Sequence, residues 1–278
     1  MIRKLTIKEK SSIIIKSLMQ RYKNHDISAY AALMAFFLTL SLFPFLIVLF
    51  SVLGRFSLNT NLIINALELF FPPETHILVV EFIQKNIILQ GSSLISVSIF
   101  GALWASSRGI RALMLSLNMA YEVRETRNYL FVKLIDIFYT ILIIIGIVIL
   151  LFIPMIGREF LYFIAQYVTI SPALIELIAL IRIIALPFSI LLIIISIYMF
   201  MPNQKQPFIK VIPGTLFTVI FLIALSYLFS IFTNYIANFS LIYGSLYTII
   251  ILMIWFYITS IILILGGELN SVFEKMPE

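Results

Sequence analysis

LISVSIFGALWASSRGIRALMLSLNMAYE, residues 94–122, is an apolar stretch of helical length that carries a polar stripe. The stripe consists of Trp104, Ser107, Arg108, Arg111, Asn118 and Tyr121. As one helix the stretch is about 43 Å long at 1.5 Å per residue. Positions 104, 108, 111, 115, 118 and 122 recur at intervals of three and four, so they share one helix face. Two arginines are costly in such apolar sequence, which makes the stripe the first candidate for function.

The composition of the chain indicates its broad class. Of 278 residues, 62% are hydrophobic, 12% are charged and 25 are Phe, and the mean hydropathy is +1.11. So little polar surface cannot cover a soluble domain of this size. Several apolar runs instead approach the roughly 20 residues that a helix needs to cross a hydrocarbon core of about 30 Å. The sequence therefore predicts an all-α, polytopic membrane protein.

Six segments qualify as transmembrane helices. They cover approximately residues 30–53, 94–114, 134–156, 183–201, 211–233 and 244–265. The second is the least certain from length alone, because its uncharged part ends at Ser107. If it crosses, most Lys and Arg residues fall on one side of the membrane, and if it does not, this bias disappears. Because basic residues accumulate on the cytoplasmic side, we expect six spans with both termini in the cytoplasm.

The connections fit this topology. Residues 1–28 are expected to form an amphipathic cytoplasmic segment on the anionic inner leaflet. Residues 29–272 then form the six-helix domain, with an external segment at 54–93 and a cytoplasmic tail at 273–278. The external segment is predicted to hold two short amphipathic helices joined at Pro72-Pro73.

The two stripe arginines have two acidic residues at a similar predicted depth. Asp136 opens the third span and Glu268 closes the sixth. Three interpretations remain open: a structural ion pair with either carboxylate, snorkelling of the arginines to inner headgroups, or a ligand role such as binding an anionic headgroup. Gly109 beside Arg108 predicts close approach of another helix.

Three further positions are hinge candidates: Pro44, Pro187 and the pair Pro213-Gly214. Proline removes a helical hydrogen bond, so kinks are expected at Pro44 and Pro187. A kink can mark a moving joint, but simple helix shape is the preferred interpretation.

Several classes of chemistry lack their motifs. The chain has no cysteine and two histidines, His25 and His76, so neither a thiolate nor a Cys- or His-based metal centre is predicted. No phosphate-binding GxxxxGK[ST] motif and no paired carboxylates within a span are present. We expect no enzyme, no metal and no cofactor, and the positive net charge follows from topology rather than from a nucleic-acid partner.

The chain resembles the YihY/BrkB family of bacterial inner-membrane proteins along nearly its whole length. The resemblance is carried by blocks at 29–45, 103–113 and 118–121, and by Leu186-Pro187, Met201–Asn203, Pro213-Gly214, Tyr243–Leu246, Trp255–Tyr257 and Gly266–Asn270. It implies a six-helix protein of the bacterial cytoplasmic membrane. Some relatives are labelled tRNA-processing ribonucleases, and others are associated with serum resistance, envelope integrity or export of lipid-like molecules. The family supplies no established catalytic residue.

The expected function is transport or flipping of an amphiphilic or lipidic envelope component. A non-transporting envelope scaffold is the alternative, and an ion-coupled small-solute antiporter is a third possibility. The expected partners are membrane lipids, together with a second copy of the chain or an envelope protein. Because no ATP-binding motif is present, uphill transport would need an ion gradient or such a partner.

Overall fold

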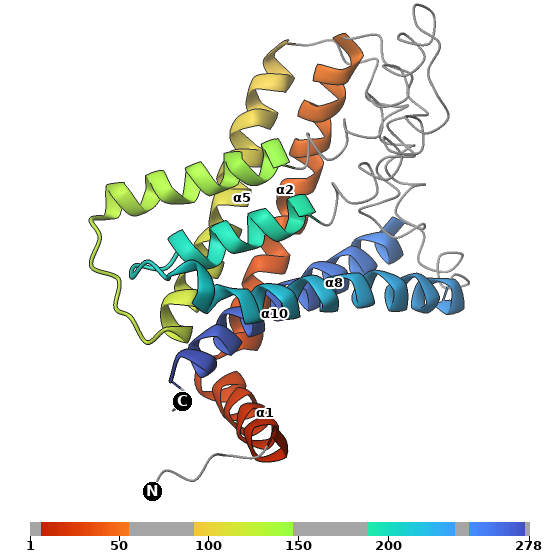
Figure 1. Cartoon of the computed structure of the whole chain (residues 1–278). Helices are drawn as coiled ribbons and strands as arrows, with labels where there is room; N and C mark the ends of the chain where they lie inside the picture. The colour runs from red at the N-terminus through yellow and green to blue at the C-terminus, as the bar shows by residue number, and fades with distance from the viewer. Residues whose placement is uncertain (1–6, 56–91, 147–187, 237–244, 276–278) are drawn as a thin grey trace, which may run out of the picture.

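The computed structural model describes residues 7–55, 92–146, 188–236 and 245–275, and these residues are helical with short connections and contain no strand (Figure 1). The labelled helices are α1 (Ile7–Asn24), α2 (Ile27–Arg55), α5 (Ser92–Ala120), α8 (Phe208–Ile236) and α10 (Ser245–Lys275). Two further helices span Tyr129–Gly146 and Phe188–Phe200. The prediction of an all-helical protein is confirmed over these residues.

Within the described residues, three helices are long and apolar enough to cross a membrane: Tyr129–Gly146, α8 and α10. A fourth span is possible if α1 and the first part of α2, which meet at 65°, are taken together. Each of the six predicted spans overlaps a helix, although residues 147–156, 183–187 and 244 lie outside the described residues. So do most of the external segment 54–93, Pro187 and the last three residues of the tail.

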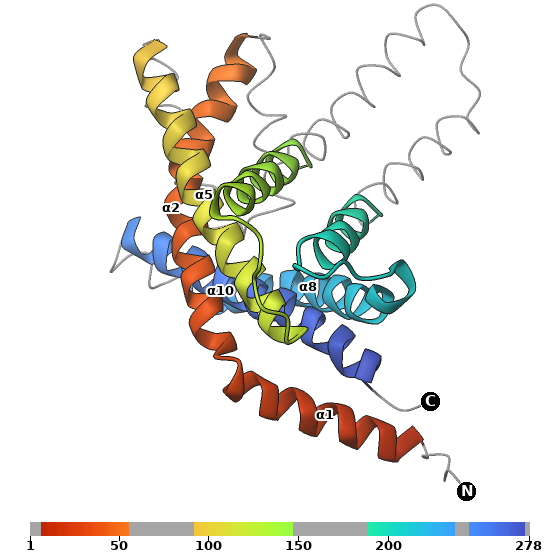
Figure 2. The same cartoon turned by 90° about the vertical axis from the view of Figure 1, so that its left-hand side faces the viewer.

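Helices α2 and α5 lie side by side and antiparallel, as both views show (Figures 1 and 2). Pro44 of α2 faces Gly101 of α5, whereas Met34, earlier in α2, faces Gly109, later in α5. The close approach predicted at Gly109 is therefore present, because the Met34 carbonyl oxygen would lie 3.7 Å from an added Cβ there. Pro44 lies inside a helix that continues on both sides of it.

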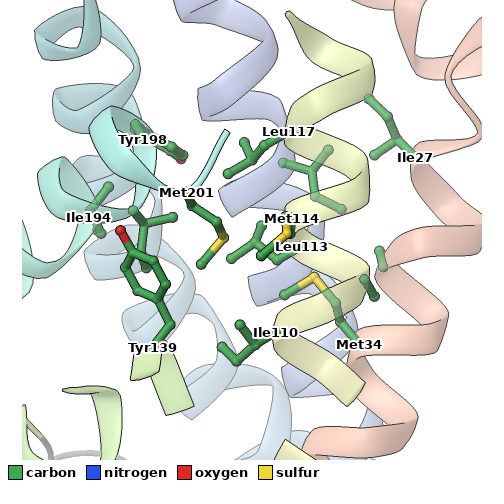
Figure 3. Packing of buried hydrophobic residues seen from close by; sticks show 14 of the residues in the cluster. Ile27, Met34, Ile110, Leu113, Met114, Leu117, Tyr139, Ile194, Tyr198 and Met201 are labelled. Atoms are coloured by element: carbon green, nitrogen blue, oxygen red, sulfur yellow. The ribbon is translucent and has the colours of Figure 1, made fainter. Parts of the chain in front are cut away.

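The buried core surrounds the C-terminal half of α5 (Figure 3). It joins side chains from six of the described helices and the segment that follows Phe200, including Val211 of α8 and Ile264 of α10. The residues labelled in Figure 3 are Ile27, Met34, Ile110, Leu113, Met114, Leu117, Tyr139, Ile194, Tyr198 and Met201. Tyr198 is fully buried, and its hydroxyl donates to the Leu263 carbonyl at 2.6 Å and lies 2.7 Å from Thr218 Oγ1. This core holds α5 at the centre of the described helices.

Helices α8 and α10 cross at glycines. A Cβ at Gly214 would overlap the carbonyl oxygen of Gly266 and the Asn270 side chain, and one at Gly266 would overlap the Thr218 and Tyr198 oxygens. Small residues allow helix backbones to approach closely in membranes. Pro213 and Gly214, which lie near the start of the predicted fifth span, are in the second turn of α8.

The helix α1 leaves the bundle at a sharp turn. Asp26, between α1 and α2, has a φ of 47°, and its carbonyl accepts hydrogen bonds from the Ala29 and Tyr30 amides. One edge of α1 packs on α10 and α2, while Ile15 and Met19 are 59% and 69% exposed. The amphipathic segment predicted for residues 1–28 is thus a helix from Ile7, and its membrane contact stays a prediction.

We expect Gly214→Ala to destabilise the folded protein by roughly 1–3 kcal/mol, because overpacking forces α8 and α10 apart. Thermal unfolding in detergent measures the effect. Gly109→Ala is the matched control, since a Cβ there meets its nearest atom at 3.6 Å, an ordinary van der Waals contact. Equal unfolding temperatures for the two variants would contradict the close crossing.

Candidate functional site

The carboxylate of Glu268 lies at the most enclosed part of the described structure. Residues 266–272 of α10 are all buried, and Glu268 is 0% exposed. Arg21 Nη1 donates to Oε2 at 2.9 Å, and the imidazole Nδ1 of His25 lies 2.6 Å from Oε1. A buried carboxylate needs this kind of compensation, because removing a charge from water costs several kcal/mol. Both oxygens therefore depend on the N-terminal helix and the turn that follows it.

The Arg21 guanidinium connects three helices. Besides Glu268, Nη1 donates to the Ala120 carbonyl at 2.9 Å and to Ser271 Oγ at 3.2 Å, while Nη2 donates to Glu122 at 3.2 Å. Lys275 also pairs with Glu122, at 2.6 Å. We call this set the Glu268 cluster, which comprises Arg21, His25, Glu122, Glu268, Ser271 and Lys275. It fastens α1 to the C-terminal ends of α5 and α10.

The turn after α5 places Glu122 in this cluster. The Glu122 and Val123 amides donate to the Met119 and Asn118 carbonyls, the bond pattern of a Schellman cap. Glycine usually occupies the left-handed position of this cap, but here Glu122 does so with a φ of 56°. The hydrogen bond from Lys275 lowers the pKa of the Glu122 carboxyl. The strained residue thus supplies a charged side chain that glycine lacks.

Asn118 joins two connections rather than facing the membrane. Its Nδ2 donates to Glu125 at 2.9 Å, and its Oδ1 accepts from the Asn203 amide at 2.8 Å. The Arg127 guanidinium donates two hydrogen bonds to Glu125, of 2.7 Å and 2.6 Å, and the Arg127 amide donates a third at 3.0 Å. These bonds lower the pKa of the Glu125 carboxyl to about 2. Asn118 is 4% exposed, so its role is to hold the turn after α5 against the segment around Asn203.

The polar stripe is divided along α5. Trp104 and Arg108 are exposed, and the guanidinium carbon of Arg108 lies 5.7 Å from the Trp104 ring centre. Ser107 is buried and accepts a hydrogen bond from Lys133 at 3.1 Å. The buried Tyr121 side chain lies next to Asn270, whose Oδ1 accepts from the Gly214 amide at 2.6 Å. The buried stripe residues make contacts within the protein, whereas the side chains of Trp104 and Arg108 are exposed.

Neither expected ion pair of the stripe arginines is present between the described residues. Glu268 pairs with Arg21 and His25 instead. No described carboxylate lies within 4.0 Å of Arg108 or Arg111, and Asp136 Oδ1 has no hydrogen-bond partner in the described structure. Glu268 is not available to the stripe arginines because Arg21 and His25 already occupy both of its carboxylate oxygens.

Sequence reasoning missed Arg21 and His25, because it assigned residues 1–28 to the membrane surface. One signal was available. Leu18 and Arg21 of α1 and His25, in the turn that follows, recur at intervals of three and four, so one face combines an apolar residue with two residues that can donate to a carboxylate.

Comparisons with known proteins cover nearly the whole chain. The profile of the family described as Virulence factor BrkB matches residues 18–278. The chain is 36% identical over 261 residues to the "Putative ribonuclease-like protein YfkH" of Bacillus subtilis (strain 168), covering 94% of this chain and 95% of that protein. It is 27% identical over 99 residues to the "UPF0761 membrane protein PSHAa0171" of Pseudoalteromonas translucida (strain TAC 125), covering 34% and 33%. No solved structure matches.

We expect Arg21→Ala to lower the free energy of unfolding by about 3–5 kcal/mol, because it leaves the Glu268 charge incompletely compensated in a buried site. Thermal unfolding in detergent measures the change. Adding Glu268→Gln removes that charge and should restore part of the loss. The control is Lys210→Ala, which breaks a more exposed pair with Glu274 and should cost less than about 1 kcal/mol. If Arg21→Ala is no worse than this control, the cluster does not hold α1 in place.

We also expect the Glu125–Arg127 pair to make stability depend on pH. The pKa of Glu125 is lowered from 4.5 to about 2, so the pair stabilises the fold fully above pH 4.5 and ceases to do so as pH falls towards 2. Its contribution is at most about 3 kcal/mol. The difference in unfolding free energy between wild type and Glu125→Gln should therefore shrink over this range. A difference that is constant from pH 7 to pH 3 would refute this linkage.

Proposed function

The chain belongs to the virulence factor BrkB family and is a multi-pass protein of the cell membrane, and we propose that it transports or flips an amphiphilic or lipidic component of the envelope. The proposal includes six spans with both termini in the cytoplasm. In that topology the Glu268 cluster lies at the cytoplasmic end of the bundle, where long basic side chains reach the headgroups.

The observation that carries the proposal is that the two stripe arginines have no acidic partner among the described residues. Arg108 and Arg111 lie on a helix with exposed apolar residues, among them Val97 and Phe100 at 70% and 75% exposure. Neither has a carboxylate partner among the described residues. Ionisable groups within membrane segments are expensive and are usually functional. An unpaired guanidinium is suited to bidentate binding of a phosphate or carboxylate headgroup.

The setting of these cations favours an amphiphile over a water-soluble polyanion such as RNA. The neighbouring helix Tyr129–Gly146 exposes Leu134 at 64% and Phe138 at 61%. Apolar surface beside unpaired cations matches a molecule with a charged head and apolar tails. The name of the Bacillus relative contains the word ribonuclease, and that name belongs to the relative alone. For this chain we propose a non-enzymatic role.

A scaffold role is the second candidate, and the Glu268 cluster favours it. That cluster is fully paired and ties three helices together, as a structural lock would. A small-ion antiporter is less well supported, because its usual coupling site is a carboxylate near the middle of a span. Asp136 lies near the start of the predicted third span, 134–156, and Glu268 lies beyond the end of the predicted sixth span, 244–265.

We expect wild-type protein in proteoliposomes to move fluorescent lipid between leaflets, measured as the fraction of label accessible to an external quencher. Arg108→Ala/Arg111→Ala should slow this movement by about tenfold or more, because charge-assisted contacts to the headgroup are lost. The control Lys205→Ala/Lys210→Ala removes two positive charges from exposed positions outside the stripe. Folded protein that moves no lipid, anionic or zwitterionic, would favour the scaffold instead.

A further inference from the structure

Asp136 is a buried acidic residue that the fold leaves unsatisfied. It lies on the helix Tyr129–Gly146, is 3% exposed, and its Oδ1 has no hydrogen-bond partner in the described part of the chain. The neighbouring Thr140 hydroxyl donates to the Asp136 carbonyl at 2.7 Å, not to the carboxylate. A buried acceptor without a donor is costly, so such a group in a membrane helix calls for a ligand or another donor.

Four basic residues lie in the same region as this carboxylate. Lys133 is one turn earlier on the same helix, Arg127 precedes that helix, and Arg108 and Arg111 are on α5, which Lys133 contacts through Ser107 at 3.1 Å. Arg127 is neutralised by Glu125 at 2.6 Å. The other three are not paired with a described carboxylate: Lys133 binds the Ser107 hydroxyl at 3.1 Å, Arg111 contacts the Met114 sulfur at 3.7 Å, and Arg108 stacks on Trp104. The seam between α5 and the helix Tyr129–Gly146 therefore combines three available cations with one available acceptor.

This combination requires two kinds of group in one ligand. The cations match a phosphate, which accepts hydrogen bonds from Arg and Lys. The carboxylate would repel a bare phosphate, but it matches an N–H or O–H donor that lies a few atoms from that phosphate. A phosphodiester headgroup with a terminal amine or hydroxyl has both groups.

We propose that Asp136, Arg111, Lys133 and Arg108 form a headgroup subsite that selects phospholipids with a hydrogen-bond donor, such as ethanolamine or glycerol, over choline. The inference rests on the proposed function and names the substrate class of the same stripe. Choline has a positive charge but no N–H or O–H, so it leaves the Asp136 acceptor unsatisfied.

The geometry also indicates how a lipid reaches the subsite. Lys133 and Arg111 are partly exposed, and weak acceptors hold both side chains, so each rotates aside at small cost. The helix that carries Asp136 leaves the apolar side chains of Leu134 and Phe138 exposed, where they can contact the acyl chains of a lipid. A lipid is thus favoured over a soluble phosphodiester of the same headgroup.

The test measures equilibrium binding in detergent micelles by native mass spectrometry. The probes share their acyl chains and carry ethanolamine, its mono-, di- and trimethylated forms, or glycerol. Soluble glycerophosphoethanolamine is added as a competitor. Wild type should bind the ethanolamine lipid roughly tenfold more tightly than the choline lipid, with the loss at the last methylation, when the final N–H disappears. Glycerol should bind like ethanolamine, and the soluble competitor should displace little lipid.

Two variants assign the selectivity to the subsite. Asp136→Asn is nearly isosteric and replaces the charged acceptor by a weaker neutral one, so it should lower the ethanolamine-to-choline ratio clearly. Arg111→Gln should weaken the binding of all phospholipids alike. Glu274→Gln, which removes a carboxylate from the more exposed pair with Lys210, is the matched control and should keep the wild-type ratio. Because the wild-type lipid series needs no variant, the test stands even if Asp136→Asn fails to fold.

The outcomes separate this inference from the proposed function. Equal binding of ethanolamine and choline lipids by wild type overturns the subsite, even if the protein moves both lipids across the membrane. Full displacement of the lipid by the soluble competitor would show that the subsite binds the headgroup alone. That result would overturn the inference that its ligand is a lipid. Selective binding without any lipid movement supports the subsite and rejects transport, because a scaffold that binds a specific lipid gives that result.

Discussion

The arrangement of the described helices depends on the buried carboxylate of Glu268. A charge with no exposure to solvent is tolerated only where hydrogen bonds and opposite charge compensate it. Here Arg21 supplies a positive charge and a hydrogen bond at 2.9 Å, and His25 Nδ1 lies 2.6 Å from the other oxygen. This requirement fixes α1 against α10. Through the remaining donors of Arg21 it also fixes the C-terminal end of α5, where the cap places Glu122 in a backbone conformation usually taken by glycine.

Two groups of charges therefore have different roles. The Glu268 cluster has its carboxylates paired with cations, and it joins elements that are far apart in the sequence. Arg108, Arg111 and Asp136 lie near one another without ion pairs among the described residues. Paired charges at a helix junction determine shape, whereas unpaired charges beside apolar surface are suited to a ligand. Pairing, more than burial or residue type, separates the structural part of the molecule from its candidate binding site.

The candidate site could be predicted only in part. The sequence pointed to Arg108, Arg111 and Asp136 because charges within apolar helices are conspicuous. It assigned Glu268 to the same group, since depth along a span can be estimated from sequence but the neighbour of a helix cannot. Arg21 looked like an ordinary basic residue of a surface helix, and nothing local shows that its guanidinium would reach a carboxylate 247 positions away.

Over the described residues, the sequence by itself determined the all-helical class, the membrane location and the approximate place of the apolar helices, because these follow from hydropathy and from the length needed to cross lipid. It also predicted a close approach of another helix at Gly109, whereas the close contact at Gly266 is known only from the structure. Only the tertiary structure decided which charges meet. Packing between distant segments produces three features: the bend of 65° between α1 and α2, the close crossing of α8 and α10, and the burial of Asn118. Ion pairs act over a few ångströms, so their partners are set by that packing.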